Sequence, residues 1–142
     1  MAGGSISSII VKAKNTALKN VQQEVSQRTY RAANELRNAS LYILRGQGSG
    51  RMYGAHQASA PGEPPAVDTG TFRGSWQTQV HVEKGGSHFK AVAQIESAER
   101  VGGYLLGELL ENGTSKMDPR PYKQKIIDRA LPKVKQIYSA PY

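Results

Sequence analysis

The longest pattern in the chain is a helical stripe that occupies its first third. Apolar residues recur there at steps of three and four, the period of an amphipathic α-helix. They are Ile6, Ile10, Ala13, Ala17, Val21, Val25, Ala32, Leu36, Ala39 and Ile43. No proline interrupts the stripe, and the glycine-rich run 46–50 follows it. The pattern predicts a helix over residues 6–45, which at about 60 Å must protrude, bend or pack on another subunit, since a domain of this size is about 30 Å across.

The middle of the chain changes to the alternating period of β-strands. Trp76, Thr78, Val80 and Val82 alternate with polar residues, and after a glycine pair Phe89, Ala91, Ala93 and Ile95 again occupy every second position. Two such runs around Gly85 and Gly86 predict an antiparallel hairpin over residues 76–96, with its turn at those glycines.

Between the first helix and the hairpin lies a segment rich in proline and glycine. Residues 51–56 have the character of a short strand, and residues 58–70 contain three prolines, which favour a long, partly extended loop. Thr69 is the predicted N-cap of a single helical turn through Ser75. Phe72 and Trp76 are four residues apart, so their rings are expected to meet on one side of that turn.

Two more helices are predicted after the hairpin. Residues 104–111 form a short one that ends at Asn112-Gly113. Asp118 and Pro119 are the expected N-cap and first turn of a last helix, over residues 118–138. Pro132 lies inside it and should kink or split it near Asp128.

These elements predict one α+β domain that covers residues 1–142. A small antiparallel sheet carries the long N-terminal helix and the C-terminal helix on one face, because the period is two in the middle and 3.6 at both ends. The residues expected in the core are Phe72, Trp76, Val80, Phe89, Ala93, Ile95, Leu106, Leu109, Ile126 and Ala130.

Composition narrows the class of protein. The chain has 142 residues and no cysteine, which excludes a disulfide scaffold, a thiol nucleophile and a cysteine-ligated zinc site. No apolar run is long enough to span a bilayer, and the N-terminus lacks the features of a signal peptide. We therefore expect a soluble, intracellular domain without a membrane association.

The net charge of +8 is unevenly distributed. Residues 6–45 and 116–142 each contain seven basic and two acidic side chains, whereas residues 46–115 contain five basic and seven acidic ones. Basic helices suit non-specific contact with nucleic acid, although aromatic residues for base stacking are few. A solvated or subunit-contacting charged face is the alternative, and the favoured one.

Catalytic and metal-binding patterns are weak throughout. His56, His81 and His88 lack metal-ligand spacing, and a triad of Ser75, His81 and Asp68 has no nucleophile elbow. The glycines of residues 46–50 lack the strand and Lys-Ser/Thr of a phosphate loop, which favours a flexible connector. Glu108 and Glu111 are expected to face solvent. We predict no catalytic residue, no cofactor and no metal.

Two stretches of sequence carry a more specific signal. Residues 58–75 read ASAPGEPPAVDTGTFRGS, and residues 110–122 read LENGTSKMDPRPY. In order and separation they resemble the head–tail joining and tail-completion (neck) proteins of long-tailed bacteriophages. The chain departs from the usual family pattern at Asn112, Asp118 and Tyr122.

The resemblance implies a non-enzymatic structural protein of the virion, present in the host cytoplasm during assembly. It implies a homo-oligomeric ring in the neck, hexameric or dodecameric, between the DNA-filled head and the tail. The implied partners are the head-closure (adaptor) protein and the tail terminator or tail-tube protein, with non-specific contact to DNA in the channel. The alternative function is that of a small basic protein that binds nucleic acid without sequence specificity.

The same two stretches are the expected assembly elements. Prolines lower the entropy that a loop loses on ordering, and isolated charges can pair across subunits. The residues predicted at this interface are Pro61, Glu63, Pro64, Pro65, Asp68, Arg73, Lys116 and Arg120. The alternative is that the loop only returns the chain to the hairpin, with Asp68 and Thr69 capping the short turn.

Overall fold

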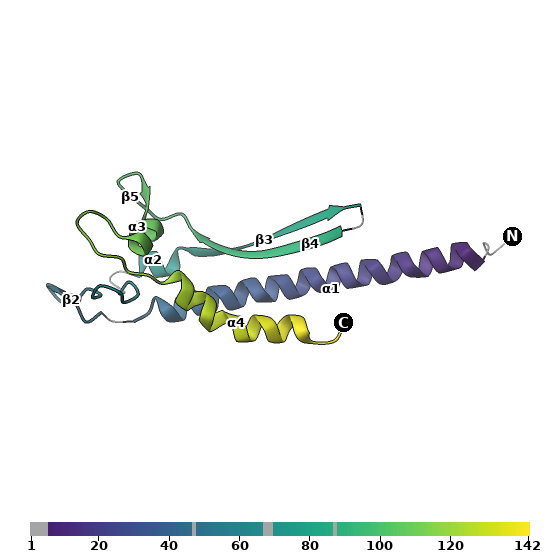
Figure 1. Cartoon of the computed structure of the whole chain (residues 1–142), viewed down its shortest axis with the longest axis horizontal. Coiled ribbons are helices and arrows are strands. Elements are labelled where there is room, and N and C mark those ends of the chain that lie inside the picture. Colours follow the sequence, from purple (N-terminus) through teal and green to yellow (C-terminus); the bar gives the residue numbers. More distant parts are fainter. Residues whose placement is uncertain (1–5, 47, 67–69, 87) are drawn as a thin grey trace.

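A single α-helix, α1 (Ile6–Ile43), runs along most of the length of the molecule (Figure 1). The computed structural model describes residues 6–46, 48–66, 70–86 and 88–142. With 38 residues, α1 is about 57 Å long. Residues 6–20 are exposed throughout, whereas α1 is buried on one side from Arg28 onward. The predicted helix is confirmed, although it ends at Ile43 and not at Arg45, and within the single chain its N-terminal part protrudes.

A two-stranded antiparallel hairpin lies along α1. It consists of β3 (Trp76–Gly85) and β4 (His88–Ser97), with Val80 opposite Ala93 and Thr78 opposite Ile95. On β4 every second residue is half-buried and those between are exposed, as the period of two predicts. The half-buried residues include Phe89, Ala91, Ala93 and Ile95. The turn lies one residue later than predicted, because Gly85 still pairs with His88 at the end of the ladder.

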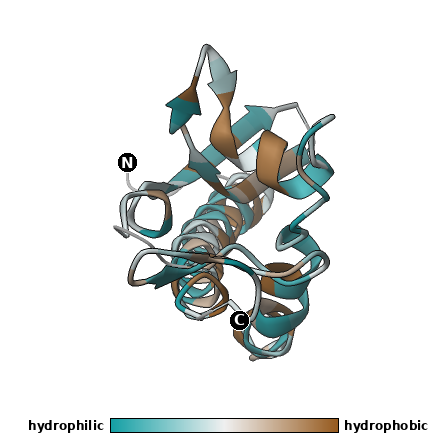
Figure 2. Ribbon diagram, turned by 90° about the vertical axis from the view of Figure 1, so that its left-hand side faces the viewer, coloured by the Kyte–Doolittle hydropathy of each residue, from teal (hydrophilic) through white to brown (hydrophobic). Residues whose placement is uncertain are grey.

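The last helix, α4 (Lys123–Ser139), packs against α1 and runs back along it (Figure 1). Figure 2, which looks along the molecule, shows α1 between the hairpin and α4, so that both helices lie on the same side of the hairpin. The predicted α+β class, with a small antiparallel sheet and helices on one face, is confirmed.

The start of α4 differs from the prediction. Asp118 and Pro119 do not open the helix, which begins only at Lys123. A residue that precedes proline is disfavoured in helical conformation, and both Asp118 and Arg120 precede one. The helix then runs without interruption past Pro132, so of the predicted kink or split the split is excluded.

Short elements fill the end of the molecule where α1 stops. β1 (Met52–Tyr53) and β2 (His56–Gln57) pair, as do β5 (Arg100–Val101) and β6 (Tyr104–Leu105). The turn α2 (Thr71–Gly74) has Gly70 at its N-cap, with a φ of 84° that favours glycine. The predicted cap, Thr69, lies outside the described residues. Helix α3 (Leu106–Asn112) begins two residues later than predicted and ends where expected.

The core is smaller than predicted and centred on three aromatic rings. Phe72, Trp76 and Tyr122 meet edge to face, with centroid separations of 5.7 to 5.8 Å. Trp76, Ile126 and Ala130 are buried as predicted, and the other seven expected core residues are only half-buried. The other buried hydrophobic residues are Ala32, Ala33, Ala39, Leu44 and Tyr122. The helical period predicts Ala32 and Ala39 on the apolar stripe of α1 and Tyr122 on the buried face of the last helix, whereas Ala33 and Leu44 were not predicted.

Candidate functional site

The two motif stretches meet in space and are joined by hydrogen bonds. Residues 58–66 and 113–121, here called the loop pair, lie at the end of the molecule where α1 stops. The Gly62 amide donates to the Pro119 carbonyl at 3.1 Å. Arg120 Nε lies 3.1 Å from the carbonyl oxygen and 3.0 Å from the hydroxyl of Ser59. The fold thus places the two stretches of the resemblance on one surface.

Glu63 organises the first half of the loop pair. Its carboxylate accepts hydrogen bonds from the Ser49 amide at 3.0 Å, the Ser49 hydroxyl and the Ala60 amide at 2.8 Å. These donors favour the charged form, led by the Ser49 hydroxyl, and lower the pKa of Glu63 to about 2. Its predicted pairing with a neighbouring subunit therefore competes with these bonds inside the chain.

Of the other predicted interface residues, some make contacts within the chain and others are exposed. Arg120 also donates to the Asp118 carbonyl at 2.8 Å, and Arg73 Nε donates to the Leu41 carbonyl at 2.8 Å, which ties α2 to α1. Pro65 is buried and Pro64 is half-buried. Pro61 and Lys116 are exposed. Asp68 lies outside the described residues.

The glycine-rich stretch after α1 packs closely against the loop pair. The Gly50 amide donates to the Ala58 carbonyl at 2.8 Å. A Cβ added at Gly48 would lie 2.1 Å from that same carbonyl oxygen, so only glycine fits there. Gly48 and Gly50 therefore pack against the Pro-rich loop, whereas the sequence pattern predicted only a flexible connector here.

The carboxylate of Glu111 supplies the cap that Asp118 was expected to provide. It accepts from the amides of Tyr122 at 2.8 Å and Lys123 at 3.2 Å, at the start of α4. Glu111 is half-buried for this reason, whereas Glu108 is exposed as predicted and pairs with Lys123. The sequence shows Glu111 only as an acidic residue with no obvious partner. Its role as a cap could not be predicted, because the tertiary fold brings it to the start of α4.

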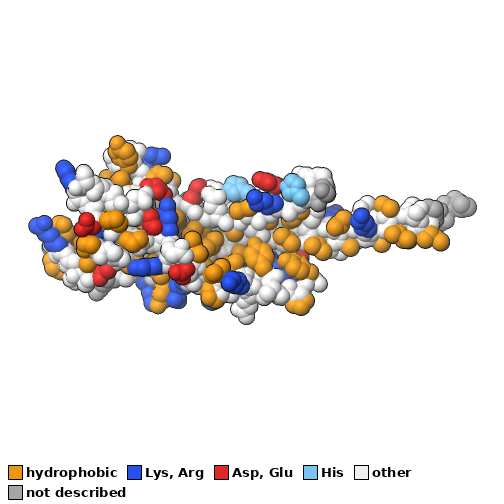
Figure 3. All heavy atoms as spheres, viewed as in Figure 1, with side chains coloured by type: hydrophobic (Ala, Val, Ile, Leu, Met, Phe, Trp, Pro, Cys, Tyr) orange, Lys and Arg blue, Asp and Glu red, His pale blue; other side chains and the backbone are white. Residues whose placement is uncertain are grey.

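The projecting part of α1, residues 6–20, carries several exposed apolar side chains. Ile6, Ile9 and Ile10 are 78%, 58% and 61% exposed. Figure 3 shows hydrophobic side chains along this part of the helix, well away from the body of the molecule. Three lysines accompany them, and no acidic residue precedes Glu24 in the helix.

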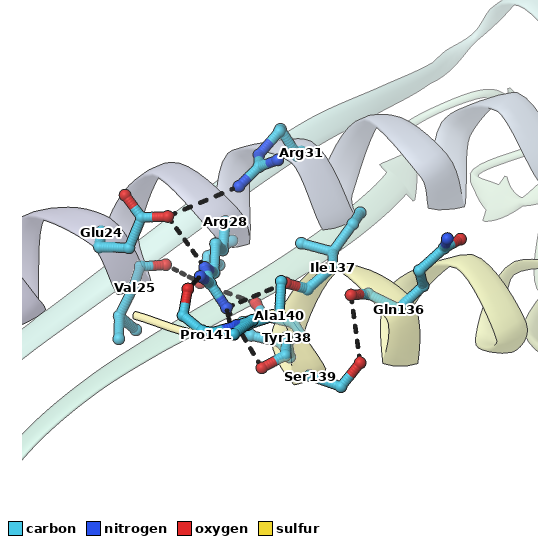
Figure 4. Close-up of polar contacts among 11 residues, drawn as sticks. Glu24, Val25, Arg28, Arg31, Gln136, Ile137, Tyr138, Ser139, Ala140 and Pro141 are labelled. Atoms are coloured by element: carbon cyan, nitrogen blue, oxygen red, sulfur yellow. Dashed lines mark hydrogen bonds and ion pairs between the residues drawn. The ribbon is translucent and has the colours of Figure 1, made fainter.

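The buried side chain of Arg28, in the middle of α1, forms hydrogen bonds with the end of α4 (Figure 4). Arg28 is 2% exposed, and its guanidinium donates to the carbonyls of Ile137, Tyr138, Ala140 and Pro141 at 2.6 to 3.3 Å. Its Nε also donates to Glu24 at 3.0 Å. Four carbonyl groups at a helix end, which would otherwise lack partners, are thereby satisfied.

Among the described residues, no cluster of His, Asp or Glu is suited to hold a metal ion. The Ser75 hydroxyl is engaged with the Phe72 carbonyl at 2.6 Å and with Ser97. Within the same part of the chain, none of the helices has the length and apolar character needed to cross a membrane.

Comparisons with known proteins give no relative. The chain matches no protein-family model, no curated protein and no solved structure.

Proposed function

We propose that this chain is a structural protein of a long-tailed bacteriophage that forms a homo-oligomeric ring in the neck, between head and tail. It acts in assembly and has no catalytic role. Its partners are further copies of itself, a head-closure or adaptor protein, and a tail terminator or tail-tube protein. In this proposal the protein resides in the virion, after assembly in the host cytoplasm.

The observation that carries the proposal is the projecting part of α1. Most helical stability in proteins comes from tertiary packing, and residues 6–20 are exposed on all sides. The segment contains several weak helix formers, including Ser7, Val11 and Thr16, and its first turn lacks an acidic residue that would favour the helix dipole. A second copy that covers its isoleucines would contribute about 1.5–3 kcal/mol for each side chain buried.

The hairpin and the loop pair support the same proposal. Among the described residues β3 and β4 form a sheet of only two strands, so each has an unpaired edge suited to a neighbouring subunit. The loop pair joins the two stretches that resemble neck proteins into one surface, where Pro61 and Lys116 remain exposed. A contact between different surfaces of identical subunits generates a ring when the rotation closes.

The test compares two pairs of charge substitutions on helices. Ile6→Glu with Ile10→Glu places two carboxylates on the projecting part of α1. Ile127→Glu with Leu131→Glu does the same on α4, at the same spacing and at 46% and 41% exposure. By light scattering, the wild type and the α4 pair should form the same defined oligomer, and the α1 pair should be a folded monomer.

Two results would contradict this proposal. The first is a wild-type chain that stays monomeric at every concentration, because it then forms no ring. The second is an equal change of oligomeric state in the two double variants, because α1 would then have no special role in assembly. The genes next to this one supply an independent check, because portal, adaptor and tail-tube genes are expected there. Retardation of DNA by a purely monomeric chain would favour the alternative, a small nucleic-acid-binding protein.

A further inference from the structure

Two arginines enclose a tyrosine where the end of α1 meets α4. The guanidinium carbon of Arg45 lies 3.8 Å from the centroid of the Tyr42 ring, and that of Arg129 lies 3.2 Å from it. Both distances are too short for the two groups to share one face of the ring. The arginines therefore stack on opposite faces, and we call these three residues the Arg-Tyr-Arg stack.

The stack holds positive charge that the rest of the chain does not neutralise. Arg45 and Arg129 are exposed and, among the described residues, have no carboxylate within 4.0 Å of their nitrogens. Lys125 lies one helical turn before Arg129 and donates to the Gly62 carbonyl at 3.2 Å. Lys133 lies one turn after Arg129, with Glu35 at 3.8 Å. Among the described residues, Lys133 is therefore the only one of Lys125, Arg129 and Lys133 that has an acidic partner.

Stacking fixes the guanidinium planes and leaves their in-plane N–H groups toward solvent. A stacked guanidinium is held by the face of the ring, while its N–H donors lie at its edge, where a phosphate can accept two hydrogen bonds. Such pre-organisation lowers the entropy lost when a ligand binds. The arrangement therefore suits an array of phosphates more than an isolated surface charge would.

The covered ring also indicates which nucleic acid fits. Proteins that bind single strands stack bases on exposed aromatic faces, and both faces of Tyr42 are occupied. At this ring, contact is then restricted to the backbone, which in a duplex lies on the outside and carries no direct sequence information. We propose that the Arg-Tyr-Arg stack, with Lys125, is a binding site for the phosphate backbone of double-stranded DNA. This inference rests on the proposed function for the source of the DNA and is tested separately from it.

The experiment measures binding of a short fluorescein-labelled duplex by anisotropy over a range of salt concentrations. Arg45→Gln with Arg129→Gln should weaken binding about tenfold and reduce the slope of log K against log salt by about 1.8, since each phosphate contact contributes about 0.9. The control is Lys84→Gln with Lys90→Gln, which removes the same charge from exposed positions on the hairpin and should leave binding unchanged.

Four outcomes would overturn the inference. They are no binding of duplex by the wild type at low salt, equal weakening by the two pairs, preference for the single strand, and equal displacement of the DNA by poly-glutamate. The last would assign the stack to an acidic protein surface. Light scattering on the arginine pair separates this test from the proposed function, because the pair should form the same oligomer as the wild type.

Discussion

At the scale of single residues, the fold depends on polar groups that the hydrophobic pattern does not reveal. Arg28 falls within the helical stripe at a place where the apolar residues pause. In the structure it is buried and supplies donors to four carbonyls at the end of α4. The sequence offers no sign of this, because the partners are more than 100 residues away.

Arg28→Met should therefore destabilise the chain strongly. The substitution keeps a long apolar stem but leaves four carbonyls and Glu24 without the donor they share, which we expect to cost about 3–5 kcal/mol in unfolding free energy. Urea denaturation measures this loss. Arg31→Met is the control, since Arg31 is 58% exposed and lies 3.8 Å from the same Glu24. It should cost less than about 1 kcal/mol, and equal costs would contradict a special role for Arg28.

Glu63 makes stability depend on pH. Its pKa is about 2 in the folded chain and 4.5 without the loop contacts, so the folded state holds the charged form more strongly. The resulting stabilisation is fully present above pH 4.5 and is lost as the pH falls toward 2. The melting temperature of the wild type should drop over this range by more than that of Glu63→Gln. Glu83→Gln is the control, because Glu83 is exposed, and it should behave as the wild type does. If the melting temperatures of the wild type and of Glu63→Gln fall in parallel as the pH is lowered, Glu63 contributes nothing to the pH dependence of stability.

At the scale of elements, local pattern predicted most of the structure and tertiary contact decided the rest. The alternation around Gly85 and Gly86 placed the hairpin correctly, because one face of it packs against α1. The start of α4 was placed too early, because the cap comes from Glu111 on another helix. Tyr122 is buried, as the period of the last helix predicts, and its hydroxyl donates to the Gly107 carbonyl at 2.9 Å.

The candidate interface was predictable only in part. Its two segments were identified from their motifs, and the fold brings them together at Gly62 and Pro119. Their use of Glu63 and Arg120 within the chain was not predictable, because the partners, Ser49 and Ser59, are uncharged. The length of the helix predicted that it must protrude, bend or pack on another subunit, but not that residues 6–20 are the exposed part.

The connection between α1 and the loop pair should tolerate no side chain at Gly48. In Gly48→Ala the new Cβ would overlap the Ala58 carbonyl, and the backbone must move apart. We expect a loss of about 1–3 kcal/mol in unfolding free energy, as for other overpacked sites. Gly46→Ala is the control, because nothing lies within 4 Å of a Cβ there. If both variants unfold alike, the close packing of this stretch is unimportant.

At the scale of the whole molecule, the main feature is the contrast between the two ends of α1. The C-terminal part lies between the hairpin and α4, with Arg37 donating to the Trp76 carbonyl at 3.0 Å. The N-terminal part projects beyond the hairpin and α4, and residues 6–20 are exposed (Figure 1). Residues 6–20 add about 22 Å of helix that the body does not stabilise. A neighbouring copy that covers this segment is the central claim.

Amide hydrogen exchange across residues 6–20 of the wild-type chain tests that claim most directly. Exchange should be fast at low concentration, where no second copy covers the segment, and should slow strongly as the chain is concentrated and its mass rises to that of a defined oligomer. Amides in the α1–α4 contact, around Ala32 and Ala33, should be protected at every concentration. Fast exchange across residues 6–20 in the fully assembled oligomer would contradict the account, because α1 would then project unused.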